Sequence, residues 1–107
     1  MRMVIGQSTG WPPGSADLIR TRLEFALGRF AGRVRSLRVS CTDVNGARGG
    51  VDKRCLISIR LTRSHRVIVI DDVDADHAIA IDRAAHRAAR AVARAVEWEH
   101  DWRVTPR

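Results

Sequence analysis

Four arginines recur near the end of the sequence at a spacing that fits one face of a helix. They are Arg83, Arg87, Arg90 and Arg94. At about 100° per residue, this spacing places the four guanidinium groups within roughly 60° of one another. We expect few carboxylates near enough to neutralise the row: Glu97 flanks its end, and Asp82 points well to the side. The pattern therefore predicts a ridge that binds the phosphates of a polyanion; a solvated helix face is the alternative.

An earlier helical segment carries a weaker group of arginines. Arg22 and Arg29 share one side of that segment, whereas Arg20 and Arg33 do not clearly join them. We expect Arg22 and Arg29 to add phosphate contacts, and ordinary exposure to solvent is the alternative.

The two cysteines, Cys41 and Cys55, lack the C-x-x-C spacing of a metal or redox motif. Both fall on the inward side of predicted strands, so we expect buried thiols that can touch. The alternatives are a metal site, a redox pair or a small enzyme that uses a cysteine with a histidine.

The four histidines show no ligand spacing, and the aspartates at 71, 72, 74 and 76 lack the glycine and glutamate of a calcium loop. We therefore expect no catalytic residue, no metal, no cofactor and no small-molecule substrate.

The tryptophans allow two interpretations. Trp98 and Trp102 lie one helical turn apart after the arginine row, so they can stack on bases or pack against an apolar surface. Trp11 stands beside two prolines and is expected to cover the edge of the core.

Length and charge limit the classes of protein that fit. The 107 residues are enough for one domain, 1–107, with an ordered core over about 1–100. The net charge is +7, and all basic residues except Lys53 are arginines, which suit bidentate contacts with phosphate. No apolar run approaches the length of a membrane span, and the first residues do not form a secretory signal. We expect a cytoplasmic protein without membrane contact.

Hydrophobic periodicity predicts the elements that position these residues. Alternating patterns indicate strands at 2–5, 37–42, 55–61 and 66–70; helical patterns run from Ser15 to about Gly32 and from Ala75 to about His100. Ser15 and Asp74 are the expected N-caps. The order β-α-β-β-β-α predicts an α+β fold in which a four-stranded, antiparallel-rich sheet carries two helices on one face. A double-stranded-RNA-binding domain has similar layers.

Several segments resemble ribosome hibernation-promoting factors, also called ribosome-associated translation inhibitors. Residues 76–82, DHAIAID, resemble the D-x-Y-A-A-I-D stretch that opens the last helix of that family, and the arginine row resembles its basic helix. Residues 39–46, VSCTDVNG, and 48–55, RGGVDKRC, are similar to the strand–loop–strand of a short-form branch. Ala78 stands where the family has tyrosine, and residues 11–14 make the first loop different.

The resemblance implies a short-form protein that binds the small ribosomal subunit between head and body, near the decoding region and the mRNA–tRNA channel. It implies ribosome hibernation under stress, with translation inhibited by steric occlusion and no bond made or broken. The arginine row, with Arg22 and Arg29, would contact 16S rRNA phosphates, and the protein would be a monomer off the ribosome that does not dimerise ribosomes by itself. A general module for structured RNA is the alternative in the same class.

Overall fold

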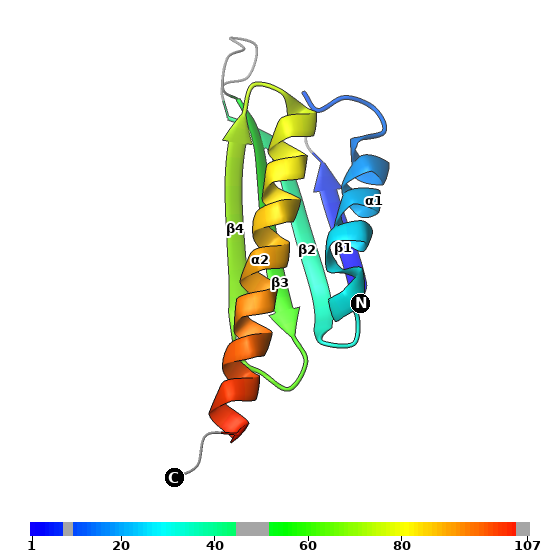
Figure 1. Ribbon diagram of the computed structural model, residues 1–107. Helices are drawn as coiled ribbons and strands as arrows, with labels where there is room; N and C mark the ends of the chain where they lie inside the picture. The colour runs from blue at the N-terminus through cyan, green and yellow to red at the C-terminus, as the bar shows by residue number, and fades with distance from the viewer. Residues whose placement is uncertain (8–9, 45–51, 105–107) are drawn as a thin grey trace.

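The computed structural model describes the backbone of residues 1–7, 10–44 and 52–104, and the side chains of these residues up to 99. Its elements follow the predicted order (Figure 1). They are strand β1 (Arg2–Gln7), helix α1 (Ser15–Leu27), the short 3-10 helix η1 (Gly28–Phe30), β2 (Val34–Asp43), β3 (Lys53–Leu61), β4 (Val67–Asp74) and helix α2 (His77–Val104).

The four strands form one mixed sheet in the order β1-β2-β3-β4. β2 pairs with β3 and β3 with β4 in antiparallel fashion, which confirms the antiparallel-rich prediction. β1 pairs with β2 in parallel, because α1 carries the chain back over the sheet between them. Residues 45–51, between β2 and β3, lie outside the described residues.

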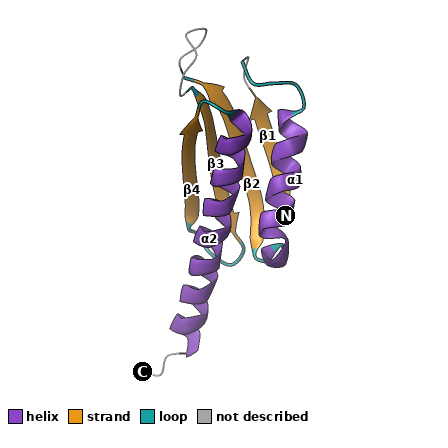
Figure 2. Ribbon diagram, turned by 45° about the horizontal axis from the view of Figure 1, so that its top comes forward, coloured by secondary structure: helices purple, strands orange, loops and turns teal. Residues whose placement is uncertain are grey.

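Both helices cover the same face of the sheet and leave the other face open (Figures 1 and 2). The inward residues of β2 and β3 are buried, and the apolar stripes of both helices are buried or half-buried, as their periodicity predicts. Small alanines on α2 let this helix lie close to the strands. The core that they close includes Ile19, Leu23, Leu27, Leu37, Val39, Ile57, Ile59, Ile81, Ala85, Ala88 and Val92.

Trp11 completes the core at the edge near the start of α1, as predicted. Its side chain is 5% exposed, and its indole N–H donates to the carbonyl of Thr42 at 2.8 Å. The ring meets that of His77 edge to face, with centroids 6.4 Å apart. This hydrogen bond satisfies the one polar group that burial of the ring removes from water.

Two predicted caps are wrong. Gly14 with a positive φ of 83° occupies the N-cap of α1, and Ser15 is already helical, its hydroxyl donating to the carbonyl of Pro12 at 2.6 Å. At α2 the cap is Asp76, whose Oδ1 accepts from the amides of Ala78 and Ile79. Asp74 instead binds the amide of Asp76, because it still belongs to the sheet.

β4 is longer than predicted. It continues from the expected end at Ile70 through Asp74, which pairs with Lys53 at the far end of β3. Three aspartates expected before the helix therefore lie within an edge strand of the sheet. Strand propensity disfavours aspartate, but ion pairs with neighbouring elements compensate, as shown below. Among the described helices, none is long and apolar enough to cross a membrane.

Candidate nucleic-acid interface

The four predicted arginines of α2 are all exposed and face the side of the helix next to β4. Asp76 caps the helix about two turns before Arg83. The row does not present four equivalent charges, however. Its first two members are joined to β4, and its last two are not.

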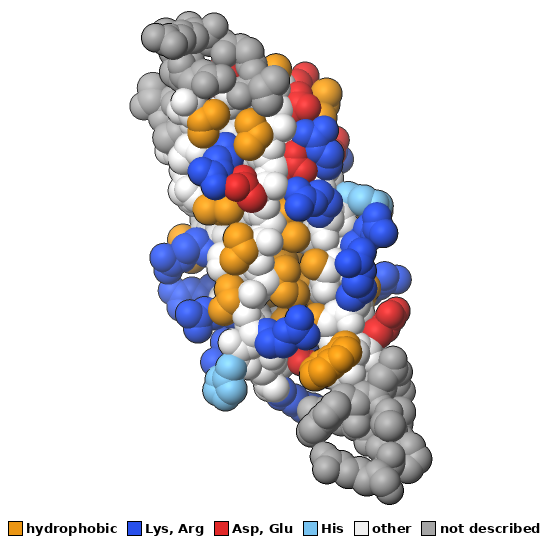
Figure 3. Space-filling view, turned by 90° about the vertical axis from the view of Figure 1, so that its left-hand side faces the viewer, with side chains coloured by type: hydrophobic (Ala, Val, Ile, Leu, Met, Phe, Trp, Pro, Cys, Tyr) orange, Lys and Arg blue, Asp and Glu red, His pale blue; other side chains and the backbone are white. Residues whose placement is uncertain are grey.

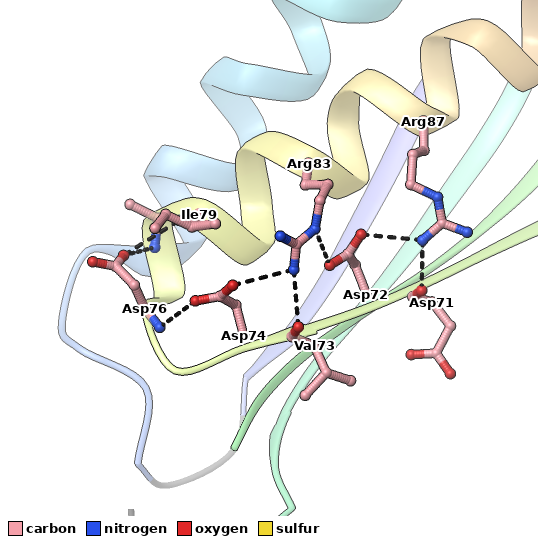
Figure 4. A network of polar contacts seen from close by, with 9 residues as sticks. Asp71, Asp72, Val73, Asp74, Asp76, Ile79, Arg83 and Arg87 are labelled. Atoms are coloured by element: carbon pink, nitrogen blue, oxygen red, sulfur yellow. Dashed lines mark hydrogen bonds and ion pairs between the residues drawn. The ribbon is translucent and has the colours of Figure 1, made fainter. Parts of the chain in front are cut away.

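Arg83 is held by three acceptors on β4 (Figure 4). Its Nε donates to Oδ1 of Asp72 at 2.7 Å, and its Nη2 donates to the carbonyl of Val73 at 2.9 Å and to Oδ2 of Asp74 at 3.2 Å. The hydrogen bond with Asp72 raises the pKa of the Arg83 guanidinium above its ordinary value. Arg83 thus joins α2 to the sheet through β4.

Arg87 shares the same carboxylate. Its Nη1 lies 3.1 Å from Oδ2 of Asp72 and donates to the carbonyl of Asp71 at 2.7 Å. Asp72 is only 6% exposed, and it bridges Arg83 and Arg87 with its two oxygens. A buried carboxylate paired on both oxygens is the arrangement that burial of a charge requires.

These contacts correct one sequence prediction. The row was expected to have few carboxylates nearby, but β4 brings Asp72 and Asp74 against its first two arginines. The neutralising aspartates precede the helix in the chain and reach it because β4 runs alongside α2 in the fold (Figure 1).

Arg90 and Arg94 remain without a carboxylate partner in the part of the chain that the structure describes. Together with Arg87 they line a hollow of about 250 Å³ between α2 and β4, with Ile70 and Ala91 as its apolar residues. We call Arg87, Arg90 and Arg94 the α2 arginine surface. Three guanidinium groups around one hollow suit an anion with several oxygens, such as a phosphate.

A second groove, of about 810 Å³, adjoins the α2 arginine surface and shares Arg94 with it. Trp98 lies on this groove, 56% exposed, with the guanidinium of Arg66 5.6 Å from its ring centroid. The groove therefore offers one aromatic face next to cationic groups, a combination that suits stacking of a base. The side chain of Trp102, predicted to accompany Trp98, lies outside the described residues.

The structure does not bring the α1 arginines to the same hollow. Arg22 forms an exposed ion pair with Asp82 of α2 at 2.8 Å, on the side of α2 that faces α1. Arg29 lies over the ring of Phe30, 4.7 Å from its centroid. Arg22 lines a different hollow, of about 370 Å³, which lies between the two helices and is also lined by the exposed Phe25.

The cysteines face the interior. Cys41 and Cys55 are directly opposite in the antiparallel β2–β3 ladder, are buried and are free thiols. Their side chains are hydrogen-bonded, so the predicted contact exists; this bond and burial raise the pKa of the Cys55 thiol. The hydrogen bond with Cys55 lowers the pKa of the Cys41 thiol, and burial opposes this effect. Both thiols are buried and therefore poorly accessible to a substrate, which disfavours the enzyme alternative. No group of three or more possible metal ligands occurs among the described residues.

Sequence reasoning missed another set of arginines, on the open face of the sheet. Arg38 and Arg60 come from different strands and line a hollow there with Ser36 and Ser58. Alternation of polar and apolar residues in each strand does place them on the outward side. Their proximity depends on the β2–β3 register, which neither strand specifies by itself.

Fold and surface define the class: a small basic α+β domain with a mixed four-stranded sheet, two helices on one face, and arginines on α2 that have no carboxylate partner among the described residues. A solved structure of this fold is the N-terminal domain of Protein Y from Thermus thermophilus. It matches with a TM-score of 0.68 and 21% sequence identity, over 88% of this chain and 98% of that domain. No protein-family model matches the sequence. No curated protein has a significantly similar sequence.

Proposed function

We propose that this protein is a ribosome-associated translation inhibitor whose α2 arginine surface binds rRNA phosphates of the small subunit. The observation that carries the proposal is the hollow at Arg87, Arg90 and Arg94, in which two guanidinium groups have no carboxylate partner in the described chain. The fold is shared with the N-terminal domain of Protein Y, and the segments that resemble ribosome hibernation-promoting factors support a ribosomal role. Because ribosomes are the proposed partner, we expect the protein to act in the cytoplasm.

The proposed mechanism is steric. Arginines of the α2 surface make bidentate contacts with phosphate oxygens, and the domain occupies the mRNA–tRNA channel near the decoding region. Arg83 and Asp72 hold α2 against β4, so the position of the helix is fixed before binding. The backbone then needs no ordering on association, and only the exposed arginine side chains lose conformational entropy. No bond is made or broken, and translation resumes when the domain leaves.

Cosedimentation with ribosomes tests this function. We expect the protein to sediment with the small subunit and to be displaced by tRNA together with mRNA. The double variant Arg90→Gln/Arg94→Gln should release it at lower salt, whereas Arg20→Gln, an exposed arginine of α1, serves as the control for general loss of charge.

Two results would argue against the proposal. Equal affinity for any RNA duplex, with no displacement by tRNA and mRNA, would favour a general structured-RNA-binding module. Absence of any association with the small subunit would exclude the ribosomal role.

A further inference from the structure

The open face of the sheet is basic at the end where β2 begins and β3 ends. Strand register sets Arg2 of β1 beside Ser36 of β2, and Ser36 beside Arg60 of β3. Arg38, two residues further along β2, pairs with Ser58. Diagonal neighbours in such a ladder are about 7–8 Å apart at the Cα atoms, so the guanidinium groups of Arg38 and Arg60 can reach one ligand.

Arg38 and Arg60 line a hollow of about 280 Å³ with Ser36 and Ser58 between them. The two short serine side chains leave the floor of the hollow low and provide hydroxyl donors. Both arginines are exposed, and neither has an ion-pair partner among the described residues. We call this hollow the open-face arginine site.

The other end of the same face is neutralised. Arg54 of β3 makes two hydrogen bonds to the carboxylate of Asp71 of β4, at 2.9 and 2.6 Å. The contrast shows that the sheet can supply carboxylate partners for its outward arginines. At the open-face arginine site no described carboxylate pairs with Arg38 or Arg60, so their charges can attract an external anion.

The chemistry of the site selects the type of anion. Two guanidinium groups and two hydroxyls match the oxygens of a phosphodiester, which accept bidentate hydrogen bonds. The described strands contain no aromatic residue, so this face offers no ring on which a base can stack. A ligand here is recognised through its backbone, without a preference for sequence.

We propose that the open-face arginine site binds a second RNA segment through its phosphates while the α2 arginine surface binds the first. The inference rests on the proposed function of the α2 surface. Basic side chains lie on both sides of the β4 edge, toward the helices and toward the open face (Figure 3). Because the two sites face opposite directions, one RNA helix cannot cover both, and the protein joins two RNA segments.

A bridging assay with the full chain tests this inference. One RNA hairpin is fixed to beads, the protein is added, and retention of a second, labelled hairpin is measured over a range of salt concentrations. We expect the unaltered protein and Arg20→Gln to retain the second hairpin. Arg38→Gln/Arg60→Gln should bind the fixed hairpin but retain about tenfold less of the second, with a salt dependence weaker by up to about two units of slope.

The outcomes separate the two proposals. Unchanged bridging by a folded Arg38→Gln/Arg60→Gln protein overturns the second site and leaves the ribosomal function intact. Bridging that depends on these residues, without association with the small subunit, supports the second site and overturns the ribosomal function. Polyglutamate that competes as well as RNA overturns the assignment of a phosphodiester ligand.

Discussion

Arg83 of α2 and Asp72 of β4 are joined by a hydrogen bond of 2.7 Å between Nε and Oδ1. The carboxylate is nearly inaccessible to solvent, and its second oxygen is taken by Arg87. The arginine row of α2 thus divides into residues that hold the helix on the sheet and residues that present their charge outward. This division leads to the first two predictions.

Replacement of Asp72 by Asn should destabilise the protein. The change removes the charge that both guanidinium groups contact, and a hydrogen bond to a charged group contributes about 1.5 kcal/mol or more. Because each kcal/mol shifts the midpoint by about 4–8 °C in a domain of this size, we expect the melting temperature to fall by about 6–12 °C. Thermal unfolding followed by circular dichroism provides the measurement. Asp82→Asn is the matched control, because the ion pair of Asp82 with Arg22 is exposed and contributes little. Equal shifts for both variants would contradict the prediction.

Single replacements along the row should separate stability from binding. Arg90→Gln should weaken RNA binding and lower the salt slope by up to about one unit, without a change in melting temperature. Arg83→Gln should lower the melting temperature and affect the salt slope less. Fluorescence anisotropy with a labelled RNA hairpin, at several salt concentrations, measures the slopes. The same slope loss for both variants would show that Arg83 also contacts phosphate.

Stability should fall in acid because two aspartates of β4 are better stabilised when charged. The side-chain hydrogen bond from Arg54 lowers the pKa of Asp71, and the backbone hydrogen bond from Asp76 lowers the pKa of Asp74. Each carboxylate therefore contributes its full stabilisation above its unfolded pKa, about 3.9. That contribution is lost as the pH falls from about 4 through the folded pKa. Urea unfolding between pH 2 and 7 measures the dependence, which Asp74→Asn should reduce.

The two thiols should be protected in the folded protein. Cys41 and Cys55 are buried, and the raised pKa of Cys55 keeps that thiol neutral. We expect alkylation by iodoacetamide to be slow in native buffer and complete in urea, with mass spectrometry as the readout. Cys41→Ser/Cys55→Ser should retain RNA binding once its fold is verified. Rapid labelling of the native protein, or an activity lost in this variant while ribosome binding persists, would support the enzyme alternative.

Sequence periodicity predicts most of the fold correctly because burial imposes it. The alternation around Cys55 and Ile57 and the helical spacing of Ile81 and Ala85 each indicate a buried side, and all four residues are buried. One sheet with two covering helices is then an economical way to bury every apolar stripe.

The candidate site is less predictable, since its charges are paired across elements. Aspartates before a helix are usually caps, and Asp76 does cap α2. Asp72 has the same residue type but lies in β4, where its role depends on how close α2 approaches. In the same way, Arg38 and Arg60 become neighbours only through strand register. Local patterns identify the residue types and faces, whereas pairing is decided by tertiary structure.

The contacts of Arg83 and Arg87 with β4 also protect an edge of the sheet. β4 has a neighbour on one side only, and edge strands with free carbonyls invite another chain to add a strand. Arg83 donates to the carbonyl of Val73 and Arg87 to that of Asp71, so both acceptors are already occupied. A second copy that paired with β4 here would first have to displace two guanidinium groups from a buried carboxylate. The same two arginines that hold α2 in place therefore guard this basic protein against aggregation through its sheet edge.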